Sequence, residues 1–172
     1  LVNGSTSTGS VTVGVSGTLG GTGTVGGAIN VLGTLAPGPA TGIGRLTTQA
    51  SVTLAASSVS RFEINKSAAT TDQLFTSGSL ALGGTLSVSN LAGTPVAGDG
   101  FTLFQAGSVS GAFAAYALPS LSAGLRWKTS TLAQGVLGVE YDPATYVGWA
   151  ATRSFPGGAS GQSLDPDGDG LA

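Results

Sequence analysis

The sequence contains no cysteine and no histidine among its 172 residues. Without cysteine the chain has no disulfide framework and no thiolate nucleophile, and without histidine it lacks the commonest general base and metal ligand. Methionine is absent too, so Leu1 is not an initiator residue, and we expect a processed product or a piece of a longer chain. These absences restrict the chemistry that the chain can perform.

Charge is also scarce, because only 8% of the residues are charged against about 25% in an average protein. The 41% hydrophobic content and the mean hydropathy of +0.33 argue for a packed core rather than for disorder. The 6 lysines and arginines form no basic stripe, so we expect no nucleic-acid partner. No apolar run reaches the roughly 20 residues of a membrane span. The net charge is only −2, so there is little electrostatic repulsion between copies. We therefore expect association with further copies or with the rest of a larger surface protein.

Where the sequence has a pattern, apolar and polar residues alternate with a period of two, which predicts short β-strands. Glycine and proline separate these segments and predict tight turns. The Ala-rich run 112–118 is bounded by Gly111 and Pro119 and is interpreted as a strand or short coil. The predicted strands lie at 11–15, 52–54, 62–64, 80–82, 86–88, 101–103 and 136–141.

Glycine-punctuated segments recur at 17–27, 33–35 and 82–88. Repetition of short strands without helical periodicity predicts an all-β parallel β-helix, or β-solenoid, in which each coil packs on the next. We divide the chain into Gly/Thr-rich solenoid repeats (1–55), later rungs or a capping β region (56–142), and a tail (143–172). A β-sandwich is the alternative for the second part, because its strands carry bulkier residues.

The order of these segments resembles the autotransporter passenger-associated β-strand repeat family. The resemblance extends over roughly residues 15 to 140 and rests on the segments 17–27, 33–38, 54–55, 62–65, 72–74, 82–86 and 97–107. It implies a large secreted or surface-displayed bacterial protein with a right-handed parallel β-helix stem. It also implies that no catalytic residue is common to all members. No outer-membrane barrel is present in the sequence, so self-transport is not assigned.

The acidic tail is the main candidate for a metal site. Asp165, Asp167 and Asp169 stand at alternate positions before Gly170, as in the first half of a calcium-binding loop. The closing acidic ligand at about position 12 of such a loop would lie beyond Ala172. The sequence therefore predicts calcium binding in the intact parent protein, with a solvated Asp-Gly turn as the alternative.

Other candidates have simpler interpretations. Asp72 and Asp99 are possible paired acids of a polysaccharide-degrading enzyme, but both flank turns. Trp127 between Arg126 and Lys128 is a possible stacking platform for sugar, although alternation places the indole inward and the two charges outward. The segment Gly20–Gly23 resembles a phosphate-binding loop, but no helix or lysine follows it.

We therefore expect a non-enzymatic extracellular structural module on a bacterial cell surface. It would be a stem of a surface protein or the subunit of a self-associating fibre. An adhesin or a module that binds glycans is the second hypothesis, and a β-helix enzyme that degrades polysaccharides is the third.

Overall fold

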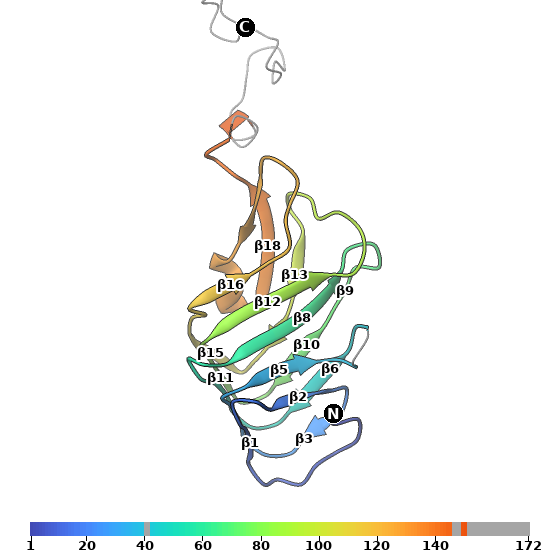
Figure 1. Ribbon diagram of the computed structural model, residues 1–172, viewed down its shortest axis with the longest axis vertical. Coiled ribbons are helices and arrows are strands. Elements are labelled where there is room, and N and C mark those ends of the chain that lie inside the picture. The colour runs from blue at the N-terminus through green and yellow to red at the C-terminus, as the bar shows by residue number, and fades with distance from the viewer. Residues whose placement is uncertain (40–41, 146–148, 151–172) are drawn as a thin grey trace, which may run out of the picture.

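The computed structural model describes residues 1–39, 42–145 and 149–150. It is 48% strand and 5% helix, and its parallel strands stack into a β-solenoid of about four turns. Figure 1 shows the strands succeeding one another upward from the N-terminus. The predicted fold class is confirmed. The three aspartates of the tail, Asp165, Asp167 and Asp169, lie outside the described residues.

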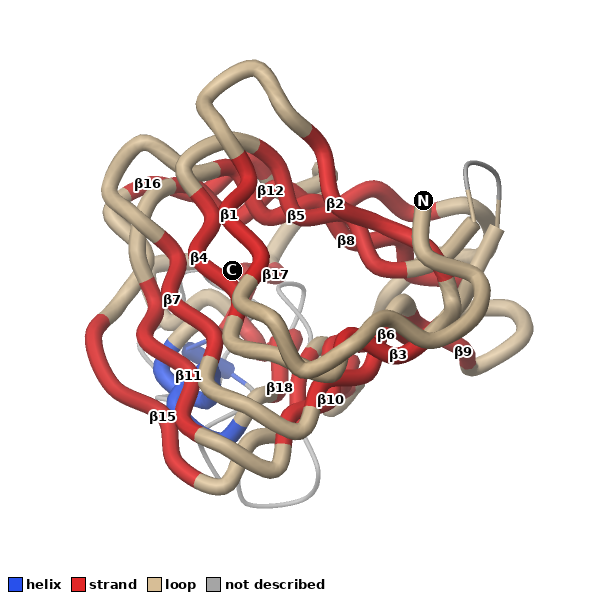
Figure 2. The backbone as a smooth tube through the Cα atoms, turned by 90° about the horizontal axis from the view of Figure 1, so that it is seen from below, coloured by secondary structure: helices blue, strands red, loops and turns tan. Residues whose placement is uncertain are grey.

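Each turn of the coil contributes one strand to each of three parallel sheets, which enclose the core (Figure 2). The first sheet holds β1 (Val11–Val13), β4 (Ile29–Val31), β7 (Val52–Leu54), β11 (Ser79–Leu82) and β15 (Ser108–Gly111). The second holds β2 (Thr18–Gly21), β5 (Thr34–Pro37), β8 (Val59–Asn65), β12 (Thr85–Asn90) and β16 (Ala115–Ala117). The third holds β3 (Thr24–Val25), β6 (Arg45–Thr48), β10 (Gln73–Thr76) and β14 (Phe104–Gln105).

Inward residues stack on equivalent residues of the neighbouring turns. In the third sheet Leu46 pairs with Leu74, and Leu74 pairs with Phe104, and all three side chains are at most 1% exposed. Full burial of a side chain of this size stabilises the fold by about 1.5–3 kcal/mol. The alternation seen in the sequence therefore arises because one face of every strand joins this continuous core.

Glycines at the corner between the first two sheets lie directly on the backbone of the turn below. β4 and β5 are joined by only Leu32 and Gly33, and a Cβ on Gly33 would lie 2.2 Å from the carbonyl oxygen of Gly14 and 2.5 Å from that of Gly17. Gly84, at the same corner two turns later, has φ +67°, and its Cβ would lie 2.1 Å from the Ser58 carbonyl oxygen. The glycine repeats thus mark close approach of backbone to backbone.

Two buried threonines close the corner between the third and first sheets. Thr48 Oγ1 donates to the Gly27 carbonyl and accepts from the Ala50 N–H. Thr76, its register partner one turn later, donates to the Ala50 carbonyl and accepts from the Gly78 N–H. Each hydroxyl therefore satisfies backbone groups that the turn leaves free.

The corner between the second and third sheets widens along the chain. β2 ends at Gly21 and β3 begins at Thr24, whereas β5 ends at Pro37 and β6 begins at Arg45. One turn later the connection forms a hairpin in which β9 (Thr70–Thr71) pairs antiparallel with β8. The last connection, after β12, includes β13 (Gly100–Thr102). Excursions of the chain are therefore concentrated at one edge of the coil.

An antiparallel sheet, which we call the cap, closes the C-terminal end. β18 (Val136–Tyr141) pairs with β13 on one side and with β17 (Leu125–Lys128) on the other, and the 3-10 helix η1 (Ser130–Gln134) precedes it. Figure 1 shows β18 above the last parallel strands. The parallel sheets continue to β16, so the second half is a solenoid with a cap and not a sandwich.

The cap seals the core with aromatic and aliphatic side chains. Phe101 is buried and packs against Trp127, with ring centroids 6.0 Å apart. Trp127 Nε1 donates to the Pro119 carbonyl oxygen at 2.7 Å. Arg126 and Lys128, its two neighbours, both pair with Glu140. The indole thus packs against the core while the flanking charges meet on the other face, as alternation predicts.

Candidate functional site

Asp72 is the most deeply buried carboxylate of the described residues, with 3% of its surface exposed. It follows the β8–β9 hairpin at the widening corner. One oxygen accepts the Gly44 N–H and the other accepts the Glu63 N–H, each at 2.8 Å. Asp72 therefore ties the β5–β6 connection to the strand of the next turn.

Burial raises the pKa of Asp72 to about 6, even though the N–H groups of Glu63 and Gly44 lower it, and the nearby charge of Glu63 adds to the rise. Gly38 faces this carboxylate with φ +98°, and a Cβ there would lie 2.4 Å from the Asp72 oxygen. Only glycine leaves room for the carboxylate at this point. Asp72 thus links two backbone segments from a position that has no room for a larger neighbour than glycine at residue 38.

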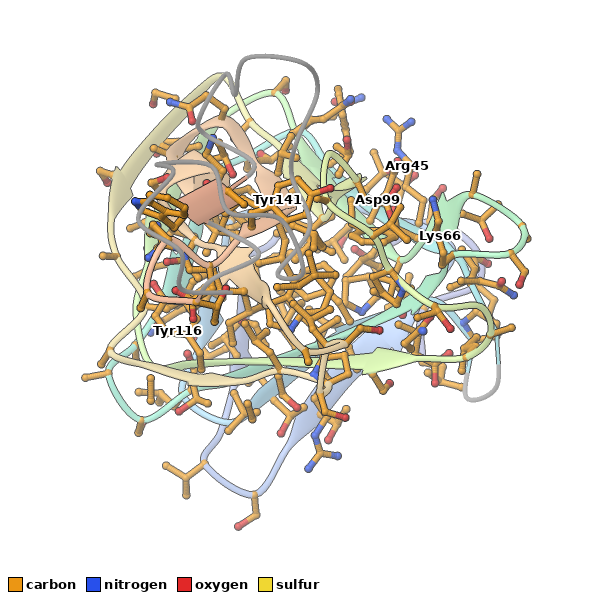
Figure 3. All side chains as sticks on the ribbon, turned by 90° about the horizontal axis from the view of Figure 1, so that it is seen from above. Arg45, Lys66, Asp99, Tyr116 and Tyr141 are labelled. Carbon is orange, nitrogen blue, oxygen red and sulfur yellow. The ribbon has the colours of Figure 1, made fainter. Side chains whose placement is uncertain are left out.

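Asp99 has different surroundings. Its carboxylate accepts from Lys66 Nζ and from the Val96 N–H, and in Figure 3 Lys66 and Asp99 lie on the same side of the molecule. Burial would raise the pKa of Asp99, but the hydrogen bonds from Lys66 and Val96 and the charge of Lys66 outweigh it, so that the pKa falls below its ordinary value. This pair joins the β8–β9 hairpin to the long connection after β12.

The candidate pairing of Asp72 with Asp99 receives no support from the contacts. Asp72 borders a cavity on the second sheet, whereas Asp99 borders two others, one with Lys66 and Thr70 and one with Lys128 and Tyr141. No hydrogen bond among the described residues joins the two carboxylates, and the cavities that they border are different ones. The acid that shares a cavity with Asp72 is Glu63, whose Oε2 accepts the Gly42 N–H at 3.2 Å.

The cavity beside Asp72 lies on the outer face of the second sheet and has a volume of about 420 Å³. Arg61 and Glu63, which flank the inward Phe62 on β8, project into it. Opposite them on β12 are Ser87, in register with Arg61, and Ser89, in register with Glu63. We call this cavity the β8–β12 groove.

Sequence reasoning missed Arg61 and Glu63. The signal was present in the alternation itself, since a strand with Phe62 and Ile64 inward must carry residues 61 and 63 on its outer face. Alternation along β8 does not show which residues of β12 lie beside these charges. That register, which places two serines opposite them, is set by the coil.

Gly20–Gly23 has no room for a phosphate. A Cβ on Gly21 would lie 2.1 Å from the Val2 carbonyl oxygen, and one on Gly23 would lie 2.1 Å from that of Gly4. The Gly23 N–H donates to the Val2 carbonyl, and the Thr24 N–H donates to that of Gly4. These backbone groups hold the N-terminal segment against the first turn.

Residues 1–39, 42–145 and 149–150 contain no group of three or more acidic side chains placed to hold a metal ion. No helix in the same residues is long and apolar enough to cross a membrane. No protein-family model matches the chain, and no significant similarity to a curated protein or a solved structure was found.

Proposed function

We propose that this chain is a non-enzymatic structural module, the stem of an extracellular surface protein similar to the autotransporter passenger-associated repeats. The observation that carries the proposal is that each described carboxylate already has a protein partner. These acids bind backbone N–H groups or basic side chains, as follows: Glu63 with Gly42, Asp72 with Gly44, Asp99 with Lys66, Glu140 with Arg126, and Asp142 with Ala144. Glu63 and Asp72 border one groove, but both bind backbone N–H groups there, which favours a structural role over the acid and base of glycoside hydrolysis.

The architecture supports a load-bearing role. The backbone ladders run from turn to turn along three sheets, and each turn protects the strand edges of its neighbours. The cap stands over the C-terminal end of the parallel coil (Figure 1), where a further copy would otherwise stack. A stem is therefore favoured over the subunit of a fibre that grows through this end.

The first test concerns location. Antibodies raised against the chain are applied to intact and to permeabilised cells of its source. Labelling of intact cells, removed by brief external protease treatment, is expected for a surface stem. Labelling that requires permeabilisation would overturn the extracellular assignment.

The second test separates stem from fibre. Negative-stain electron microscopy of the purified chain at increasing concentration is expected to show single short rods. Filaments that lengthen with concentration would favour the fibre and contradict the role given to the cap.

Glycan binding is the second candidate function, and the observation that favours it is the β8–β12 groove with its charged and hydroxyl side chains. Calcium binding by Asp165, Asp167 and Asp169 is also kept as a proposal for the parent protein. Calorimetric titration of a chain extended past Ala172 tests it, and the absence of calcium uptake at millimolar concentration would refute it.

A further inference from the structure

The basic side chains of the described residues are almost all occupied. Lys66 pairs with Asp99, Arg126 and Lys128 pair with Glu140, and the Arg45 guanidinium lies 4.3 Å from the centre of the Phe75 ring. Arg61 is different, because it is exposed and makes no ion pair, hydrogen bond or ring contact with the described part of the chain. Its guanidinium is therefore free to bind an anionic group.

The surroundings of Arg61 offer further polar contacts. Ser87 and Ser89 bring two hydroxyl groups from β12, and Thr18 brings a third from β2. Glu63 adds a carboxylate, of which Oε2 is held by the Gly42 N–H, while Oε1 has no hydrogen-bond partner within the described residues. The groove therefore brings one cation together with hydrogen-bond donors and acceptors from several strands of the second sheet.

The backbone around the groove is held in place by the coil. Six consecutive residue pairs join β8 to β12 in register, and Asp72 fixes the neighbouring connection through Gly44. Small residues, Ala36 and Gly38, line the same cavity, so a flat ligand can approach the strands. Such preorganisation lowers the entropic cost of binding.

These features define the ligand class. A guanidinium binds a carboxylate through two parallel hydrogen bonds, whereas Glu63 and the serines suit hydroxyl groups that donate and accept. A polyanion such as nucleic acid fits poorly, because Glu63 and Asp72 border the same groove and repel closely spaced phosphates. An acidic sugar carries one carboxylate among several hydroxyls, which matches this set.

We propose that the β8–β12 groove binds an acidic oligosaccharide, with Arg61 on the sugar carboxylate and Glu63, Ser87 and Ser89 on its hydroxyls. This inference rests on the second candidate function, glycan binding, and deepens it. The proposed stem role does not depend on sugar binding, and the cell-labelling experiment tests the surface location separately.

The test is titration by NMR or calorimetry with uronic-acid oligosaccharides of several linkages, each beside its methyl-esterified form. The full chain is expected to bind at least one acidic form and to bind its ester at least tenfold more weakly. Arg61→Gln is expected to lose at least tenfold in affinity. Arg126→Gln, which removes the same charge from the cap, is the matched control and is expected to bind as the parent does.

The proposal would be overturned by no binding of any acidic form at millimolar concentration, by equal binding of acid and ester, or by equal loss in Arg126→Gln and Arg61→Gln. Binding that requires a sulfated or phosphorylated polymer would likewise replace it with non-specific polyanion attraction. Far-ultraviolet circular dichroism of both variants verifies the fold, which is expected to survive because both arginines are exposed. Surface labelling of cells together with absent sugar binding would refute sugar binding in the groove and would still support the proposed stem role.

Discussion

The parallel turns and the antiparallel cap bury their apolar residues by different means. In the turns, equivalent residues stack in register, as Leu46, Leu74 and Phe104 do, and glycine corners bring one backbone onto the next. In the cap, aromatic rings such as Phe101 and Trp127 fill the end of the core, and three charged side chains meet on its outer face. The turns therefore depend on the spacing between backbones, whereas the cap depends on the bulk of its side chains.

This difference predicts opposite sensitivities. A substitution that adds one carbon harms the turns where glycine is required, and a substitution that removes a ring harms the cap. The predictions below test that contrast from the largest expected effect to the smallest.

Gly33→Ala is expected to destabilise the fold by about 4 kcal/mol, because the added carbon would overlap two backbone carbonyl groups that no side-chain rotation can clear. Urea unfolding measures the change. Gly14→Ala is the matched control at the same corner, since a Cβ there meets nothing within 4 Å, and it is expected to change stability by less than about 1 kcal/mol. Equal effects of the two substitutions would refute the role of close backbone approach.

Phe101→Ala is expected to cost about 3 kcal/mol, since it leaves a cavity beside Trp127. Hydrogen exchange followed residue by residue is expected to show faster exchange in β13, β17 and β18 than in β7 and β8. Uniform acceleration in all strands would mean that the cap and the turns unfold as one unit.

Asp72 and Asp99 are expected to give opposite pH dependences. The folded pKa of Asp72, about 6, lies above the ordinary value of about 3.9, so its contribution to stability is greatest below pH 4 and is lost as pH rises through 6. The loss amounts to roughly 2 to 3 kcal/mol. For Asp99 the folded pKa is lowered, so its contribution is present above its ordinary pKa and falls as the carboxylate is protonated.

The measurement is unfolding free energy from pH 3 to 8 for the parent, Asp72→Asn and Asp99→Asn. The parent minus Asp72→Asn difference is expected to fall with rising pH, and the parent minus Asp99→Asn difference to rise. Parallel slopes would show that the two carboxylates have similar environments.

Ser60→Ala is expected to leave stability unchanged or to raise it by up to about 1 kcal/mol. Ser60 is fully buried and pairs in register with Leu35 and Leu86, and its hydroxyl has no hydrogen-bond partner among the described residues. Thr48→Val is the contrasting control. It removes a hydroxyl that donates one hydrogen bond to the backbone and accepts another from it, and it is expected to destabilise the turns. Thermal unfolding compares them, and a clear loss of stability in Ser60→Ala would reveal a role for the hydroxyl.

The sequence predicts much of the coil and little of the groove. Strand 136–141 was expected with the bounds that the structure gives, because Val136, Val139 and Tyr141 favour extended backbone there. The antiparallel pairing of that strand was not predicted, since period-two alternation is the same for parallel and antiparallel sheets. The groove depends on which residues of β8 and β12 face each other, and period-two alternation does not encode that register, because the chain passes through β10 and β11 between the two strands.

The widening corner between the second and third sheets also affects how such a chain can change in evolution. An insertion there lengthens an excursion outside the ladders, so the register of the next turn survives. The hairpin of β8 with β9 and the long connection that carries β13 can be understood as successive elaborations of one permissive position. New recognition surfaces can therefore arise along a single side of the rod while its stacked interior remains unchanged.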